Sequence, residues 1–191
     1  PKLTYNTCMK PGQIILKTTR NDEEIIIRHL KKSDVVDLMN YINKLSKEKT
    51  YITLQGETYS LIDEQKYVDN ALEKMNEGRL IQLSLFVNKK LMGTAAVTLG
   101  TRTHKHVGQL GLSIDDAVRG KGLGRLLLET AIKESKKQLK GLRLVQLSVF
   151  ENNPVALKLY ENCGFKIAGT LPGTIAYKGR YIDEVIMCLK I

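Results

Sequence analysis

Short apolar runs alternate along this chain with segments whose apolar residues recur every three or four positions. The runs, bounded by Gly, Asn or Asp, predict strands, and the helical period predicts amphipathic helices. Strands are expected at residues 25–28, 80–87, 91–97, 109–114, 142–149, 165–169 and 181–189. A helix is expected after the cap Ser33-Asp34, through Leu45. Further helices are expected at residues 63–76 and 122–138, and from Pro154 to just before Gly164.

The order of these elements is that of one mixed α/β domain. A strand precedes two helices, a hairpin with the short turn Asn88-Lys89-Lys90, and then alternating strands and helices. This order predicts one parallel strand pair among antiparallel ones. A length of 191 residues, 42% of them hydrophobic, suffices for a single core. We assign residues 24–191 to this domain and residues 1–23 to an N-terminal extension, either a tail or an added strand.

The segment from Val118 to Leu128 carries the clearest chemical signal. Glycine lets a ligand approach the backbone closely, and the N-terminus of a helix offers unpaired N–H donors and a positive dipole end. The segment is therefore expected to bind a phosphate group through both its backbone and its cations. The candidate residues are Arg119, Gly120, Lys121, Gly122, Leu123, Gly124 and Arg125.

Two common phosphate-binding designs fit this segment poorly. A P-loop needs Ser or Thr after its Gly-Lys pair to reach magnesium, but Gly122 follows Lys121. A dinucleotide fingerprint places its third glycine three residues after the second and an acidic residue on the following strand. Here the third glycine is Gly124, and residues 142–149 contain no carboxylate. Taken alone, the glycine turn is also compatible with a plain helix start.

A second motif occupies residues 149–165. Asn153 is a good helix N-cap, Pro154 suits the first helical position, and Gly164 suits the position after the helix. The spacing Arg119-x-x-Gly122-x-Gly124 resembles the pyrophosphate loop of the GNAT superfamily of acetyl-coenzyme A dependent N-acetyltransferases. Residues 149–165 resemble the second GNAT signature, with matches at Asn153, Ala156, Leu159-Tyr160 and Gly164-Phe165.

The resemblance implies the GNAT fold from about Glu24 onward, a mostly antiparallel twisted sheet with helices on both faces. It implies acetyl-coenzyme A as the cofactor, bound by the residues from Arg119 to Arg125, by Asn153, and by Leu112, Ser113 and Ile114. In the family, the strand that contains these last three bulges and splays from the next one. Tyr160 lies beside the cofactor and, as the catalytic residue, points its hydroxyl at the sulfur.

The implied reaction is direct attack of a neutral primary amine on acetyl-coenzyme A, through a tetrahedral intermediate that expels the thiolate. The acceptor is a protein or peptide N-terminus, a polyamine or another small amine. Gln109 stands where many relatives carry a glutamate base. Glu57 is either a substrate-side base that acts through water or an exposed loop carboxylate. Tyr181 either lines the acceptor pocket or packs on the sheet edge.

Two readings of function therefore stand. The first is an acetyl-coenzyme A dependent N-acetyltransferase, in which Tyr160 acts on the sulfur. The second is a non-catalytic acyl-coenzyme A sensor on the same fold, motivated by Gln109. The C-terminal strands are a reasonable surface for a homodimer.

The charge distribution argues against nucleic acid as the partner. The net charge is +10, but residues 33–77 carry nine acidic and five basic side chains, whereas residues 78–150 carry four acidic and thirteen basic. The excess cation lies on the cofactor side, where a polyanionic cofactor accounts for part of it. Lys133, Lys136, Lys137 and Lys140 are expected on a solvated helix face. With 6% aromatic residues and no nucleic-acid module, no nucleic-acid partner is expected.

The cysteines and histidines suggest a reduced protein without a metal. Cys8, Cys163 and Cys188 are widely spaced and odd in number. His104 and His106 have no carboxylate nearby and are better explained as loop residues. Without a signal-peptide pattern or an apolar run of membrane-spanning length, a cytoplasmic location and no membrane partner are predicted.

Overall fold

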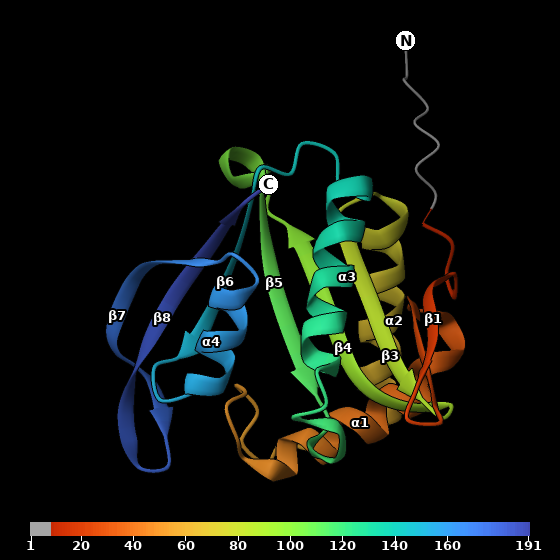
Figure 1. Ribbon diagram of the computed structural model, residues 1–191, viewed down its shortest axis with the longest axis horizontal. Coiled ribbons are helices and arrows are strands. Elements are labelled where there is room, and N and C mark those ends of the chain that lie inside the picture. Colours follow the sequence, from red (N-terminus) through yellow and green to blue (C-terminus); the bar gives the residue numbers. More distant parts are fainter. Residues whose placement is uncertain (1–8) are drawn as a thin grey trace.

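The computed structural model describes residues 9–191 and contains one open sheet with helices on both faces (Figure 1). The strand order is β1-β2-β3-β4-β5-β6-β8-β7. The strands are β1 (Ile14–Arg20), β2 (Glu23–His29), β3 (Leu80–Val87), β4 (Lys90–Leu99), β5 (Val107–Ile114), β6 (Leu144–Phe150), β7 (Lys166–Tyr177) and β8 (Arg180–Lys190). The helices are α1 (Val35–Glu48), α2 (Leu61–Asn76), α3 (Leu123–Gln138) and α4 (Pro154–Asn162).

All strand pairs are antiparallel except β5 with β6, which confirms the predicted mixed sheet. Helices α3 and α4 cover the face toward the viewer in Figure 1, and α1 and α2 lie behind the sheet. Every residue of β3 is buried, because α3 packs on one of its faces and α2 on the other. The core therefore runs through the centre of the sheet.

The N-terminal extension contributes a strand. β1 pairs with β2 in the same sheet, so the added-strand alternative is correct for residues 14–20, whereas residues 1–8 lie outside the described part of the chain. The two strands are joined by Asn21 and Asp22, which both have positive φ angles of 48° and 61°. A two-residue turn of this kind matches the right-handed twist of a hairpin. Asn88 and Lys89 form the same type of turn between β3 and β4.

Strand β7 is longer than predicted. The sequence indicated residues 165–169, but the strand continues to Tyr177 with a register shift between Leu171 and Ile175. Pro172 and Gly173 within this stretch read as a break in the sequence. Proline is tolerated here because β7 is the edge of the sheet, where its missing N–H leaves no ladder bond unmade.

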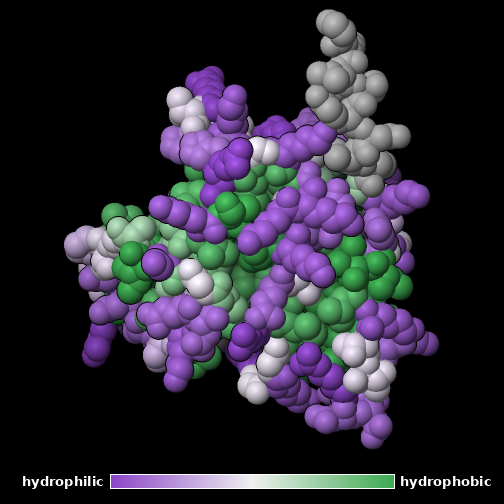
Figure 2. Space-filling model, turned by 45° about the horizontal axis from the view of Figure 1, so that its top comes forward, coloured by the Kyte–Doolittle hydropathy of each residue, from purple (hydrophilic) through white to green (hydrophobic). Residues whose placement is uncertain are grey.

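Charged and polar residues cover much of the face drawn in Figure 2, with apolar surface visible between them. On β7, Ile167 and Leu171 are among the exposed apolar residues. Within residues 9–191, none of the helices combines the length and the apolar character needed to cross a membrane.

Candidate functional site

The parallel pairing of β5 with β6 ends early. Only Val107, Gly108 and Gln109 pair with β6, at Leu144 to Gln146, and beyond Gln109 the two strands separate (Figure 1). A cleft of about 560 Å³ lies where they diverge. Its walls include Leu110 to Leu112 of β5 and Ser148 to Phe150 of β6. They also include Asn153, which caps α4, and Ala156 and Tyr160 within that helix.

The backbone of β5 directs two N–H groups into this gap. Asp115 N donates to Met92 O, and Gly100 N donates to Val107 O, so the odd-numbered residues of β5 form the ladder with β4. In an antiparallel pair the alternate residues point their N–H groups the other way. The N–H groups of Leu112 and Ile114 therefore face the side from which β6 has departed. The expected separation of β5 from β6 is present. The expected bulge is not seen in the pairing of β5 with β4, whose register runs without a shift from Gly93 to Leu99.

Ser113 has a different role from its neighbours. Its hydroxyl lies 2.9 Å from Tyr41 Oη and 3.1 Å from Thr94 Oγ1, so its side chain points to the face of α1. Its backbone groups belong to the ladder with β4 by the same alternation. Ser113 is thus tied to the scaffold on both counts, and its expected cofactor contact has no free group in this arrangement.

The glycine-rich turn supplies a cluster of unpaired donors. Gly120 and Gly122 have φ angles of +74° and +75°, a backbone conformation that favours glycine. Gly122 caps α3, and none of the N–H groups from Gly120 to Arg125 donates a hydrogen bond within residues 9–191. A Cβ on Gly120 would meet no atom within 4 Å, so the loop is open to a ligand. Such donors at a helix N-terminus are suited to a pyrophosphate group.

The cations of this turn are already paired with carboxylates. Arg119 donates to Ile114 O and lies 2.6 Å from Glu48 Oε2, which fixes the turn to β5 and α1. Arg125 pairs with Glu129 at 2.8 Å, and Lys121 lies 3.6 Å from Glu23. The backbone, more than these side chains, is therefore the available phosphate-binding group, and Arg119 has a structural contact as well.

Helix α4 positions Asn153 and Tyr160 along the cleft. Asn153 Oδ1 accepts from Ala156 N and Pro154 is the first helical residue, which confirms the predicted cap. Tyr160 is 8% exposed and its ring meets Phe165 edge-on at 5.8 Å. Burial raises the pKa of Tyr160 to about 12. The phenol therefore keeps its proton at neutral pH and acts as a hydrogen-bond donor.

The other wall of the cleft includes residues that the sequence did not point out. Tyr51 of the α1–α2 loop and Phe150 of β6 line the cleft. The ring of Tyr177 of β7 packs against both, and the three ring centroids are 5.5 to 6.0 Å apart. Glu184 of β8 lies in the same wall and accepts from Thr174 Oγ1 at 3.2 Å. These residues lie far apart in the sequence, so no local motif could have indicated them.

Both residues predicted on the acceptor side, Glu57 and Tyr181, lie outside the cleft lining, and so does Gln109, the position where relatives carry a glutamate. Gln109 Oε1 accepts from Gln146 Nε2 at 3.0 Å, which anchors it between the paired ends of β5 and β6. Glu57 accepts from the backbone N–H of Gln55, and backbone hydrogen bonds at its own residue and at Gln55 lower its pKa, which makes it a weaker base.

The predicted position of Tyr181 needs correction. It lies outside the cleft lining, and its side chain is 81% exposed. The two-residue period of β8 explains this, because Tyr181 shares the side of Val185 and Met187, whereas Glu184 faces the cleft.

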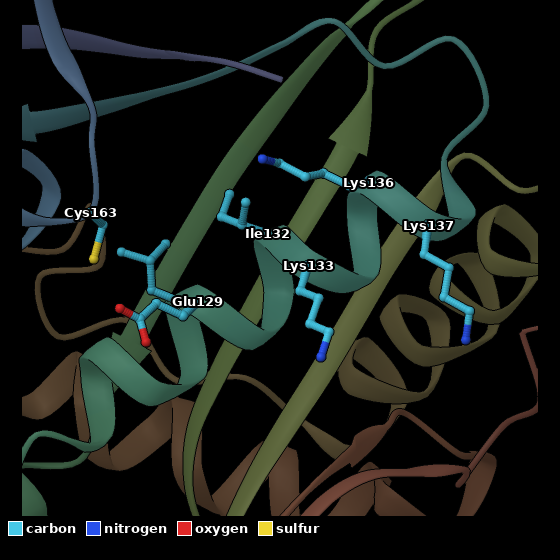
Figure 3. A pocket seen from close by; sticks show the side chains of 7 residues that line it. Glu129, Ile132, Lys133, Lys136, Lys137 and Cys163 are labelled. Atoms are coloured by element: carbon cyan, nitrogen blue, oxygen red, sulfur yellow. The ribbon is translucent and has the colours of Figure 1, made fainter.

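A separate groove of about 500 Å³ follows the outer side of α3. Cys163, at the end of α4, faces Glu129 and Ile132 of α3 across this groove, and Lys133, Lys136 and Lys137 extend from the same helix (Figure 3). These lysines are exposed, as the sequence predicted for a solvated face. Burial is the main cause of the raised pKa of the Cys163 thiol. Cys163 and Cys188 are free thiols, and Cys8 lies outside the described residues.

The family model for the acetyltransferase (GNAT) family matches residues 42–165 of this chain. The chain belongs to the GNAT family. The matched range includes the splayed strand β5, the glycine-rich turn and the whole of α4. The resemblance inferred from the two motifs is thereby confirmed.

Individual GNAT proteins show the same relationship. A Bacillus subtilis protein named as a phosphinothricin acetyltransferase is 32% identical over 88 residues, which are 46% of this chain and 53% of that protein. The chain thus spans about half the length of this curated relative. A GNAT acetyltransferase from Streptococcus pneumoniae superposes with a TM-score of 0.81 at 28% identity, over 88% of this chain and 100% of that chain.

A second solved structure shares the fold. An acetyltransferase from Salmonella typhimurium, solved with its cofactor acetyl-CoA, has a TM-score of 0.76 over 87% of this chain and 93% of that chain. Its 20% identity supports a shared fold. Together these comparisons confirm the predicted fold class.

Proposed function

We propose that this GNAT protein is an acetyl-coenzyme A dependent N-acetyltransferase that acts on primary amines. The observation that carries the proposal is the position of the cleft. It opens beside two unpaired N–H groups of β5, is flanked by Tyr160, and lies on the same strand–turn–helix unit as the unpaired donors of the glycine-rich turn. These groups fit a long cofactor with a pyrophosphate at one end and a thioester at the other.

The glycine-rich turn and β5 would bind different parts of the cofactor. The N–H groups from Gly120 to Arg125 would hold the pyrophosphate, and those of Leu112 and Ile114 would hold the pantetheine arm and the thioester carbonyl. An N–H group aimed at a carbonyl stabilises the negative charge that develops on its oxygen during attack. Asn153 keeps its capping bond and lines the cleft, so it would contribute a cofactor contact from the N-terminus of α4.

The acceptor amine would enter from the side of the α1–α2 loop. In the reaction, the neutral nitrogen attacks the thioester carbon to give a tetrahedral intermediate, after which the C–S bond breaks and the thiolate leaves. Tyr160 would stabilise the departing sulfur by donating a hydrogen bond. Glu184 is the carboxylate in the cleft wall, and we propose it as the group that attracts the acceptor ammonium and receives its proton.

The acceptor class follows from the amine chemistry. An α-amine with a pKa of about 8 is roughly one-tenth neutral at pH 7, whereas a lysine amine near 10.4 is neutral in about one molecule in 2,500. With Gln109 bound to Gln146 and Glu57 outside the cleft, a weakly basic amine is the better substrate. On this ground a peptide N-terminus is the first proposed acceptor. A polyamine or another small amine, which is more basic, would depend on Glu184 to receive its proton.

The deciding experiment combines calorimetric titration with acetyl-coenzyme A and a thiol-release screen over amines and N-terminal peptides. Binding with thiol release for one acceptor class is expected. Binding without thiol release for any amine would favour the acyl-coenzyme A sensor. That alternative is supported by Gln109, an amide at the position where many relatives carry a glutamate base. Absence of binding would mean that the glycine-rich turn is only a helix start.

We also propose a homodimer through the C-terminal edge of the sheet. β7 is the outermost strand and exposes Ile167 and Leu171, which are 56% and 46% accessible. An exposed apolar edge strand is a surface for pairing with another chain. Light scattering that gives only the monomer mass at micromolar protein would refute this assembly. A cytoplasmic location stays a prediction from the cysteine pattern.

A further inference from the structure

A second cavity, of about 300 Å³, lies between α1, α2 and the sheet. α1 and α2, which line it, lie behind the sheet in Figure 1. Its polar and aromatic lining includes Tyr41 of α1, Tyr59 of the α1–α2 loop, Glu64 and Tyr67 of α2, Gln82 of β3 and Thr94 of β4.

Glu64 is a buried carboxylate without a partner. It is 6% exposed, and its side chain makes no hydrogen bond or ion pair with any residue from 9 to 191. Burial raises its pKa. An unpaired carboxylate in a low-dielectric site is destabilising unless it is protonated or a cation joins it.

The other buried acidic residues of the described chain show how unusual this is. Asp34 pairs with Arg28 at 2.7 Å, Asp115 pairs with Lys44 at 2.6 Å, and Glu134 accepts from Gln138 at 3.0 Å. The fold thus supplies a partner for a buried carboxylate elsewhere. At Glu64 the space next to the carboxylate is a cavity.

The aromatic side chains of this cavity are held in place. Tyr41 Oη is hydrogen-bonded to Ser113, and Tyr67 Oη donates to Gln82 Oε1 at 3.1 Å. Two hydrogen bonds between Asn43 and the backbone of Tyr59, of 2.9 and 2.8 Å, fix the main chain of the third tyrosine. Tyrosine rings that line a small cavity are suited to bind a cation.

One loop separates this cavity from the acetyl-transfer cleft. Leu54 lines the cavity, whereas its neighbours Thr53 and Gln55 line the cleft. Gln55 Nε2 donates a hydrogen bond to Ile52 O at 2.7 Å, which holds the loop between the cavity and the cleft in place. A cation in the cavity would therefore lie next to the acceptor side of the cleft.

We propose that the cavity is a binding site for an aliphatic ammonium group, with Glu64 as its counter-ion and the rings of Tyr41, Tyr59 and Tyr67 as its walls. The volume accommodates a short alkyl chain. The ammonium has two sources, the second amine of a diamine acceptor or a separate effector amine. The first source rests on the proposed acetyltransferase function, and the second does not.

The site is tested by calorimetry on the full chain without acetyl-coenzyme A, with n-butylammonium and putrescine as probes and butanol as the neutral analogue. Both cations should bind, and butanol should bind at least about tenfold more weakly, since a hydrogen bond to a charged group contributes about 1.5–3 kcal/mol. Glu64→Gln should lose about tenfold or more. The control Glu73→Gln, exposed on the same helix, should bind as the unmodified protein does.

Absence of cation binding, equal binding of butanol, or unchanged affinity in Glu64→Gln would overturn the proposal. Tyr67→Phe keeps the ring and gives a second test, since cation binding should survive it. Thermal melts of each variant show whether a loss of binding reflects a loss of folding. Because no cofactor is present, a failure of the acetyltransferase proposal leaves this result unaffected.

Kinetics then identify the source of the ammonium. If it is the second amine of the acceptor, Glu64→Gln should raise KM for putrescine about tenfold while KM for n-butylamine stays constant. If it is an effector, tetramethylammonium, which cannot be acetylated, should change the rate with a peptide acceptor in the unmodified protein and leave Glu64→Gln unaffected. Cation binding without either kinetic effect would refute any link to the cleft.

Discussion

Replacing Tyr160 by Phe removes one oxygen from the cleft and little else. The side chain is 8% exposed, its ring packs edge-on against Phe165 at 5.8 Å, and its hydroxyl has no hydrogen-bond partner in the described part of the chain. The variant should therefore fold with an unchanged melting temperature. If the hydroxyl donates to the departing sulfur, its loss removes a charge-assisted hydrogen bond of about 1.5–3 kcal/mol.

This free energy corresponds to a decrease in kcat of about 10- to 100-fold, at 1.4 kcal/mol per tenfold. Thiol release at saturating amine measures kcat, and calorimetry measures the affinity for acetyl-coenzyme A, which should change less than threefold or so. Burial raises the pKa of Tyr160 to about 12, so the ratio of the two kcat values should stay constant across the neutral and mildly alkaline range.

An unchanged kcat would refute the role of Tyr160, and an equal loss of cofactor affinity would make the hydroxyl a binding group instead. A ratio that changes near neutral pH would show that another ionisation governs the effect.

Three further predictions concern the turn, the cavity and the cleft. Gly122→Ala, at a φ of +75°, should destabilise the fold by about 1–2 kcal/mol and weaken acetyl-coenzyme A binding, whereas Gly169→Ala, in open space, should do neither in denaturation and calorimetry. Because burial raises the pKa of Glu64, its ionisation destabilises the fold as pH rises, so Glu64→Gln should melt higher at neutral pH and no higher near pH ~4. Glu184→Gln should reduce kcat/KM for amines about tenfold with the cofactor affinity retained, and an unchanged value would remove Glu184 from the acceptor site.

Most elements could be predicted from the sequence because their signals are local. The bounds of β3 agree with the apolar run at residues 80–87, and the cap and first proline of α4 are as expected. α1 begins after Asp34, as expected, but it continues to Glu48 instead of ending at Leu45. α2 begins at Leu61 instead of Asp63, because its capping box starts at Ser60. The ends of helices are difficult to predict because neighbouring residues can serve equally well as caps.

The sequence left β1 open as a tail or an added strand and missed the second half of β7, for a non-local reason. Both are edge strands with mixed burial, so neither shows a sustained apolar pattern. Two local features lie in or beside these strands, the two-residue turn Asn21-Asp22 and the pair Pro172-Gly173. Each can be interpreted only when the strands that it joins or interrupts are known.

By itself the sequence determined the glycine-rich turn, the α4 motif and the family to which they belong, since these depend on residues close together in the chain. Only the tertiary structure decided that β6 leaves β5 after Gln109, that Glu184 faces the cleft while Tyr181 faces away, and that Glu64 is buried without a partner. These facts depend on strand register and on packing between distant segments, and a change of one residue in register would reverse which side chains face the cleft.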